Sequence, residues 1–201
     1  MADTIDYYFW INSDWAYLGA DRLDAIAARN GVMINYLPVD LPDVYRRTGG
    51  VLLGQRSAER QAYRVAELKR WCRELRMPVN PQPKYMCPDG DLASRLVIAA
   101  LELPRPITPL YKGILRAEWC DEQDISDPDV LRRILESQDY DADALFSRAA
   151  QPDIESRYRK NTDAAVAAGV FGSPSYVYLG EVFWGQDRLE LLEKAIQLGR
   201  G

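Results

Sequence analysis

Runs of aromatic and β-branched residues near the start of the chain predict two strands. Residues 5–11 and 32–39 form these runs, because such side chains favour the extended backbone. Between them, small and apolar residues recur at the spacing of one helix face. These are Ala16, Ala20, Leu23, Ile26 and Ala27. The chain is therefore expected to open with the order strand, helix, strand.

The last part of the chain predicts a hairpin followed by a helix. Gly169 follows an alanine-rich run and is expected to end a helix, since glycine tolerates the left-handed backbone found there. Residues 176–179 alternate as a strand, Gly180 begins a tight turn, and residues 182–184 return as its partner. Residues 185–187 then open a helix over 188–198.

A proline lies just before this hairpin. Pro174 follows Ser173, and an ordinary trans peptide bond is the more common arrangement there. A cis bond is the alternative, and it would turn the backbone of Ser173 outward at a site. The pattern of residues alone leaves both open.

The middle of the chain is predicted to be helical. Residues 56–76 place Val65, Leu68, Trp71, Cys72 and Leu75 on one face, and Met77-Pro78 ends that helix. Further helices are expected at 91–101, 109–120, 129–136, 142–150 and 154–168, with Asp91, Asp127, Asp141 and Asp153 at their starts.

The order of these elements predicts an α/β protein with a thioredoxin-like fold and an inserted all-helical domain. Residues 1–42 and 161–201 are expected to form the discontinuous thioredoxin-like domain, and residues 43–160 the insertion. A ligand site is expected in the cleft between the two parts.

Composition narrows the classes of function. The 201 residues carry a formal net charge of −5, which argues against nucleic acid as a main partner. No apolar run approaches the roughly 20 residues of a membrane span. The first residues show no basic segment followed by an apolar stretch, so no signal peptide is expected. We expect a cytoplasmic protein without a membrane partner.

The chain contains three cysteines and no histidine. Cys72, Cys87 and Cys120 are far apart in sequence and are expected to be reduced thiols; no metal site is predicted. Without histidine, neither a Ser-His-Asp nor a Cys-His hydrolase site can form. Acid–base chemistry would fall to carboxylates, tyrosine, lysine or a bound cofactor.

Four segments resemble one known family, the 2-hydroxychromene-2-carboxylate isomerases. They are DYYFWINSDWAYLG (6–19), LPVDLPDVYRRTGG (37–50), YRVAELKRWC (63–72) and GVFGSPSYVYLGEVFWGQDRL (169–189). These isomerases belong with the kappa-class glutathione transferases and the bacterial disulfide oxidoreductases. The chain departs from the usual pattern after Ser13, where Asp14 replaces a proline, and near Gly49-Gly50, where an asparagine is missing.

The resemblance implies that Ser13 is the catalytic residue. As an isolated residue, Ser13 is well explained as the N-cap of the following helix. In the family, the matching hydroxyl donates to the thiolate of bound glutathione, and the helix N-terminus favours that anion. Asp14 would oppose a nearby thiolate if it faced the site. It would have no such effect if it faced solvent.

The resemblance also implies glutathione as the cofactor. The backbone of the residue before the proline pairs with the cysteinyl part of glutathione, and the segment after the hairpin holds its γ-glutamyl end. The residues implied are Ser13, Ser173, Pro174, Trp184, Gly185, Gln186 and Asp187. Without the resemblance, Ser173 is a turn residue, Trp184 a core residue and Asp187 a helix cap.

A local excess of basic residues suggests where an acidic substrate binds. Residues 43–76 hold nine basic and four acidic side chains in an acidic protein, although a solvated helix face explains any one of them. Arg56 lies where the family binds its substrate, and arginine pairs well with carboxylates. Its neighbour Gln55 is a further candidate, and Arg47, Tyr45 and Tyr85 are weaker ones. Trp10 and Trp15 are candidates for the wall of the cleft, although core packing is the default for both.

The activity implied is a glutathione-dependent conversion of 2-hydroxychromene-2-carboxylate to trans-o-hydroxybenzylidenepyruvate, a step in naphthalene-type aromatic breakdown. A homodimer is expected by resemblance alone. Two alternatives stay open. One is a kappa-type glutathione transferase or peroxidase. The other is a non-catalytic thioredoxin-fold binding protein.

Overall fold

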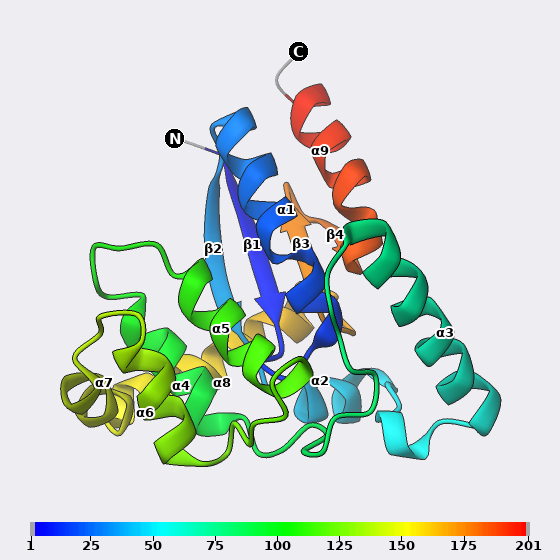
Figure 1. Cartoon of the computed structure of the whole chain (residues 1–201). Helices are drawn as coiled ribbons and strands as arrows, with labels where there is room; N and C mark the ends of the chain where they lie inside the picture. The colour runs from blue at the N-terminus through cyan, green and yellow to red at the C-terminus, as the bar shows by residue number, and fades with distance from the viewer. Residues whose placement is uncertain (1–2, 200–201) are drawn as a thin grey trace.

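The computed structural model describes residues 3–199 of the chain. Within these residues, a mixed sheet of four strands has the spatial order β2-β1-β3-β4. The strands are β1 (Thr4–Phe9), β2 (Met33–Pro38), β3 (Ser175–Tyr178) and β4 (Glu181–Trp184). Strands from the two ends of the chain thus lie side by side, with helices on both faces of the sheet (Figure 1). This is the predicted thioredoxin fold.

Strand β1 is central and sets the register of the sheet. It pairs with β2 in parallel and with β3 in the antiparallel direction. Tyr7 lies opposite Tyr36 on one side and Tyr176 on the other. Because β1 and β3 are antiparallel, the carboxyl end of β1 lies beside the start of β3. The β1–α1 connection, which follows β1 directly, therefore lies at the same edge of the sheet as the start of β3.

Helix α1 (Asp14–Asn30) begins and ends as the sequence predicts. Ser13 is its N-cap, and Gly31 ends it in the left-handed conformation with φ of 56°. Several side chains of α1 are buried against the sheet and against α5 and α9. The strand–helix–strand opening is therefore confirmed.

Helices occupy the segment between β2 and β3. They are α2 (Leu41–Thr48), α3 (Ala58–Leu75), α4 (Asp91–Ala100), α5 (Thr108–Trp119), α6 (Pro128–Glu136), α7 (Ala142–Ala149) and α8 (Pro152–Ala167), with a short 3-10 helix η1 (Leu53–Gln55). After β4, a second 3-10 helix η2 (Gln186–Arg188) leads into α9 (Leu189–Leu198). The predicted helices are present, with several starts shifted by one or two residues. The largest shifts are at α3, which begins at Ala58 rather than at residue 56, and at α8, which begins at Pro152 rather than at 154. Asp91, predicted as a cap, is instead the first residue of α4.

Helix α2 has no counterpart in the sequence prediction. It spans two turns, and only Leu41 and Val44 are buried, so its apolar pattern is too short to recognise. Asp40 caps it by accepting the Asp43 amide hydrogen at 3.1 Å, and Gly49 ends it with φ of 79°.

The β3–β4 turn lies one residue earlier than predicted. Tyr178 pairs with Glu181, so Leu179 and Gly180 form the two-residue loop. Both have positive φ values, 50° and 83°, as a type I′ turn requires. The sequence favoured Gly180 as the first turn residue because leucine rarely adopts this conformation.

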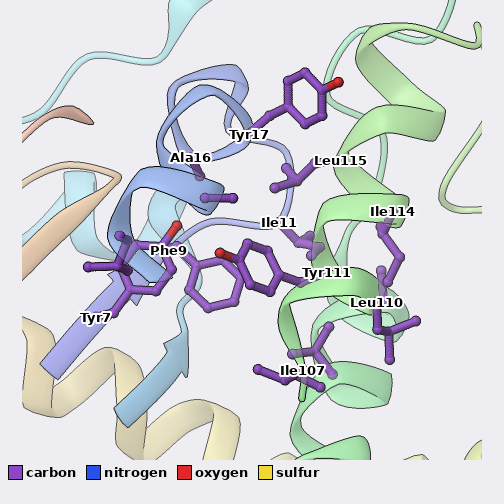
Figure 2. Packing of buried hydrophobic residues seen from close by; sticks show 14 of the residues in the cluster. Tyr7, Phe9, Ile11, Ala16, Tyr17, Ile107, Leu110, Tyr111, Ile114 and Leu115 are labelled. Carbon is purple, nitrogen blue, oxygen red and sulfur yellow. The ribbon is translucent and has the colours of Figure 1, made fainter. Parts of the chain in front are cut away.

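One core joins the sheet to the helical segment. Tyr7 stacks on Phe9 and on Tyr176, with ring centroids 4.7 and 5.2 Å apart. Tyr111 of α5 packs against Phe9 at 4.9 Å. Figure 2 shows α5 facing β1 through these rings, with Leu115 close to the first turns of α1. This packing fixes α1 and the β1–α1 connection relative to α5.

Among residues 3–199, none of the helices is both long and apolar enough to cross a membrane. The same residues contain no group of three or more cysteine, aspartate or glutamate side chains placed to hold a metal ion.

Candidate active site

A cavity of about 480 Å³ opens at the end of the β1–α1 connection. Parts of α2, η1, α3, the loop before α4 and the residue before Pro174 close around it. Its apolar wall includes Trp10, Trp15, Leu41, Leu52, Leu53 and Met86. Trp10 and Trp15, predicted as candidates for the wall of the cleft, and the weaker substrate candidate Tyr45 all line this cavity. Its polar lining includes Ser13, Asp14, Arg56, Gln61, Arg64 and Ser173.

Ser13 lies in the cavity wall at the start of α1. It is 5% exposed, and its Oγ accepts the amide hydrogen of Ala16 at 3.2 Å. The capping role predicted from sequence is therefore present. Because Oγ acts as the acceptor in this bond, its hydroxyl hydrogen remains available to a ligand. The helix N-terminus adds a favourable field for a negative charge placed there.

Ser173 shares this cavity with Ser13. The Ser173–Pro174 peptide bond is cis, so the less common of the two arrangements applies. Trp10 joins the two serines: its amide donates to Ser173 Oγ at 2.8 Å, and its carbonyl accepts the Ser13 amide at 3.0 Å. Within residues 3–199, the Trp10 amide bonds only to the Ser173 side chain, and no backbone group pairs with the Ser173 amide or carbonyl.

Asp14 faces inward and pairs with Arg64 of α3. Asp14 is 5% exposed and Arg64 is 9% exposed, and Arg64 Nη2 donates to Asp14 Oδ2. The other carboxylate oxygen accepts the Trp15 amide at 2.8 Å. Burial raises the pKa of Asp14 above its usual range, although Arg64 and the Trp15 amide counteract part of this rise. Asp14 therefore does not face solvent, and Arg64 offsets its charge.

The Arg64 guanidinium is fixed by three neighbours. Besides Asp14, its Nη1 donates to the Pro81 carbonyl at 3.1 Å. Its Cζ lies 5.2 Å from the centre of the Trp119 ring, a distance typical of a cation–π contact. These contacts anchor the middle of α3 to the β1–α1 connection and to α5.

Arg56 supplies a second guanidinium to the cavity. Its Nε donates to the Val51 carbonyl at 2.9 Å, and its Nη2 lies 3.3 Å from the Tyr45 hydroxyl. Gln61 donates to the Arg56 carbonyl at 2.8 Å. Gly50 is required beside this group, because a Cβ there would lie 2.1 Å from the Tyr45 ring. Among the described residues, the cavity lining thus contains two arginines, Arg56 and Arg64, and one carboxylate, Asp14.

Behind the cavity, Glu118 of α5 is fully buried. Its Oε1 accepts the Cys87 amide at 2.8 Å, and no residue described by the structure bonds to its Oε2. Burial raises the pKa of Glu118 to about 9, so its carboxyl group is neutral at pH 7. Burial also raises the pKa of the Cys87 thiol, which lines the cavity, so this thiol is a poor nucleophile.

The segment after the hairpin lies next to the cis-proline. The Gly185 amide donates to the Pro174 carbonyl at 2.9 Å. Gly185 has φ of 102°, and a Cβ there would lie 2.4 Å from Asp187 Oδ1. Gln186 is buried, whereas Asp187 is exposed and pairs with Arg188 at 3.0 Å. Trp184 is 50% exposed, which contradicts the alternative that it is a core residue.

Three of the substrate candidates lie outside the cavity lining. Arg47 pairs with Asp43 and Asp163 on the surface, and Gln55 is exposed in η1. Tyr85 contacts Lys84, whose Nζ lies 4.6 Å from its ring centre. Of the five substrate candidates between residues 45 and 85, the structure brings Arg56 and Tyr45 to the cavity lining.

Arg64 and Glu118 belong to the surroundings of the cavity, but the sequence did not single them out. Glu118 lies on the apolar face of α5, and Arg64 lies where the apolar face of α3 begins. Arg64 precedes buried Leu68 by one helical turn, and Glu118 follows buried Ile114 by one turn. A titratable side chain at such a position is buried either with its charge paired, as Arg64 is, or in its neutral form, as Glu118 is. This spacing is the signal that could have revealed them.

Comparison with known proteins places the chain in a family. A family model described as a DSBA-like thioredoxin domain matches residues 4–197. The 2-hydroxychromene-2-carboxylate isomerase of Sphingobium xenophagum is 31% identical over 194 residues, which cover 96% of this chain and 97% of that protein. The chain belongs to the 2-hydroxychromene-2-carboxylate isomerase family.

A solved structure of a 2-hydroxychromene-2-carboxylate isomerase is similar to this chain over nearly the whole fold. It has a TM-score of 0.79 and 25% identity, and the match covers 98% of this chain and 95% of that one. Human glutathione S-transferase kappa 1 is 21% identical over 201 residues, covering 94% of this chain and 88% of that protein. The family resemblance found in the sequence is thereby confirmed.

Proposed function

We propose that this chain is a glutathione-dependent isomerase that interconverts 2-hydroxychromene-2-carboxylate and trans-o-hydroxybenzylidenepyruvate, or a closely related aromatic intermediate. One observation carries the proposal. A helix-capping serine, the residue before a cis-proline and an arginine all line one cavity of about 480 Å³. The names of the relatives support the reaction class.

The residues present fit glutathione. Since no backbone group among residues 3–199 pairs with the amide or carbonyl of Ser173, these two groups offer an extended peptide the pairing that a strand edge would offer. Ser13 offers a hydroxyl hydrogen to sulfur at the start of a helix. The exposed Asp187 carboxylate, held near Pro174 through Gly185, suits the free amine of the γ-glutamyl group.

Glutathione, when bound, supplies the thiol that adds reversibly to the conjugated double bond and so allows that bond to rotate. Ser13 and the amides of the first turn of α1 lower the pKa of this thiol by stabilising its negative charge. Asp14 would raise it, but Arg64 neutralises Asp14 from α3. Arg56 holds the carboxylate of the substrate, and the tryptophan and leucine wall excludes water from the aromatic ring.

A kappa-type glutathione transferase is the second candidate, favoured by the similarity to the human kappa-class enzyme. It would use the same thiol but release a conjugate. The isomerase leaves glutathione unconsumed.

The test is an absorbance assay of chromene-to-pyruvate conversion, with and without glutathione, followed by mass spectrometry of the products. We expect conversion that requires glutathione and returns it intact. Net conjugate formation with a model electrophile, without isomerisation, would favour the transferase. No glutathione dependence at all would remove both candidates.

A further inference from the structure

We infer that Arg22 is a positioning residue for glutathione: it fixes the turn formed by Gly185, Gln186 and Asp187 against α1. The inference rests on the proposed function and extends it to a side chain outside the cavity. Its basis is a continuous set of contacts from α1 to the cis-proline.

Arg22 holds the turn through Gln186. Its Nη1 donates to Gln186 Oε1 at 2.6 Å and lies 3.3 Å from the Gln186 carbonyl oxygen. Gln186 is 2% exposed, so a polar side chain is buried there and depends on Arg22 as its partner. On the opposite side, the Arg22 Cζ lies 5.8 Å from the centre of the Trp71 ring of α3.

The turn can approach α1 closely because Gly19 lies beneath it. A Cβ at Gly19 would be 3.0 Å from Gln186 Cβ and 2.9 Å from the Tyr176 hydroxyl. Gln186 therefore packs directly on the helix backbone, one turn before Arg22. The turn is clamped between a glycine contact and a charged hydrogen bond.

The clamp connects two parts of the proposed cofactor site. Gln186 is followed by Asp187, whose carboxylate folds back over Gly185. Gly185 in turn donates its amide to the Pro174 carbonyl at 2.9 Å. Fixing Gln186 therefore fixes the Asp187 carboxylate relative to Ser173-Pro174. The residue that fixes it, Arg22, lies on α1, the helix that Ser13 caps.

This arrangement predicts a selective effect on the two ligands. Loss of Arg22 frees the turn that carries Asp187, so the affinity for glutathione falls. Arg56 and the apolar wall apart from Trp15 are on other elements, and Trp15 lies two helical turns before Arg22, so the affinity for an aromatic carboxylate is unchanged.

The experiment titrates reduced glutathione and, separately, trans-cinnamate into the wild type, Arg22→Ala, Arg22→Lys and Arg29→Ala by isothermal calorimetry. Arg29 is the matched control, because it also joins α1 to the C-terminal segment, through Glu193 of α9. We expect about a tenfold weaker glutathione Kd in Arg22→Ala, recovery in Arg22→Lys and no change in Arg29→Ala. In the isomerase assay, KM for glutathione rises while kcat at saturation is retained.

Other outcomes would contradict either the role of Arg22 or the proposed cofactor. If the wild type binds glutathione and Arg22→Ala binds it equally well, the positioning role is wrong. If Arg22→Ala loses cinnamate and thermal stability together with glutathione, Arg22 is merely structural. If the wild type binds cinnamate but not glutathione, the proposed cofactor itself fails, and the inference fails with it.

Discussion

The Arg64 guanidinium forms a buried ion pair with Asp14, the residue that directly follows the proposed catalytic Ser13. This contact explains how an acidic residue can stand beside a site that is proposed to favour an anion. It also ties α3 to the first turn of α1.

Breaking this pair is expected to destabilise the protein. Arg64→Met leaves a buried carboxylate without its cation, and we expect a loss of about 3–5 kcal/mol in the free energy of unfolding. Combining it with Asp14→Ala removes both charges and recovers most of that loss. Urea denaturation of the wild type, both single variants and the double variant measures the coupling. Additive losses in the double variant would show that the two residues are not coupled.

Glu118 predicts that stability depends on pH. Its pKa is raised in the folded protein to about 9, whereas an unfolded glutamate titrates near 4.3. Between these two pH values the folded state binds one proton more than the unfolded state. The contribution of Glu118 to the free energy of unfolding is therefore largest at low pH and falls as the pH rises. The slope contributed is at most about 1.4 kcal/mol per pH unit.

The variant Glu118→Gln isolates this effect. Glutamine keeps an oxygen for the Cys87 amide but does not titrate. We expect its free energy of unfolding, measured in urea from pH 5 to pH 9, to decline less steeply than that of the wild type. Parallel curves for the two proteins would contradict the assignment.

Most of the fold, but only part of the candidate site, could be predicted from the sequence. Both ends of the chain have strong strand and turn patterns, and capping residues such as Ser13 and Asp127 mark helix starts correctly. The two-turn α2 was missed because so short a helix buries only two residues. A leucine in a left-handed turn position moved the hairpin loop by one residue.

The basic segment shows why the site needed the structure. Residues 43–76 contain many arginines, but the composition of the segment does not indicate which of them face inward. Arg56 faces the cavity because η1 turns the chain, Arg64 faces inward on α3, and Arg47 faces Asp43 and Asp163. These directions follow from tertiary packing rather than from local pattern.

This difference gives a paired test of substrate binding. Arg56→Gln is expected to weaken trans-cinnamate binding at least tenfold, because a charge-assisted pair to the carboxylate is lost. Arg47→Gln serves as the control and should leave the affinity unchanged, since Arg47 lies outside the lining. Fluorescence or calorimetric titration measures both. An equal loss in both variants would point to long-range attraction instead of a direct contact.

The proposed mechanism requires that Ser13 acts on the thiol of glutathione. The deciding measurement is the thiol pKa of bound glutathione, read from thiolate absorbance near 240 nm in the wild type and in Ser13→Ala. Urea denaturation of both proteins is measured in parallel. We expect a thiol pKa below that of free glutathione in the wild type. In the variant, that pKa rises by about one unit or more, and isomerase activity falls with it. If Ser13→Ala loses only the roughly 1 kcal/mol expected for a helix cap while the thiol pKa stays unchanged, Ser13 is only a capping residue and does not stabilise the thiolate.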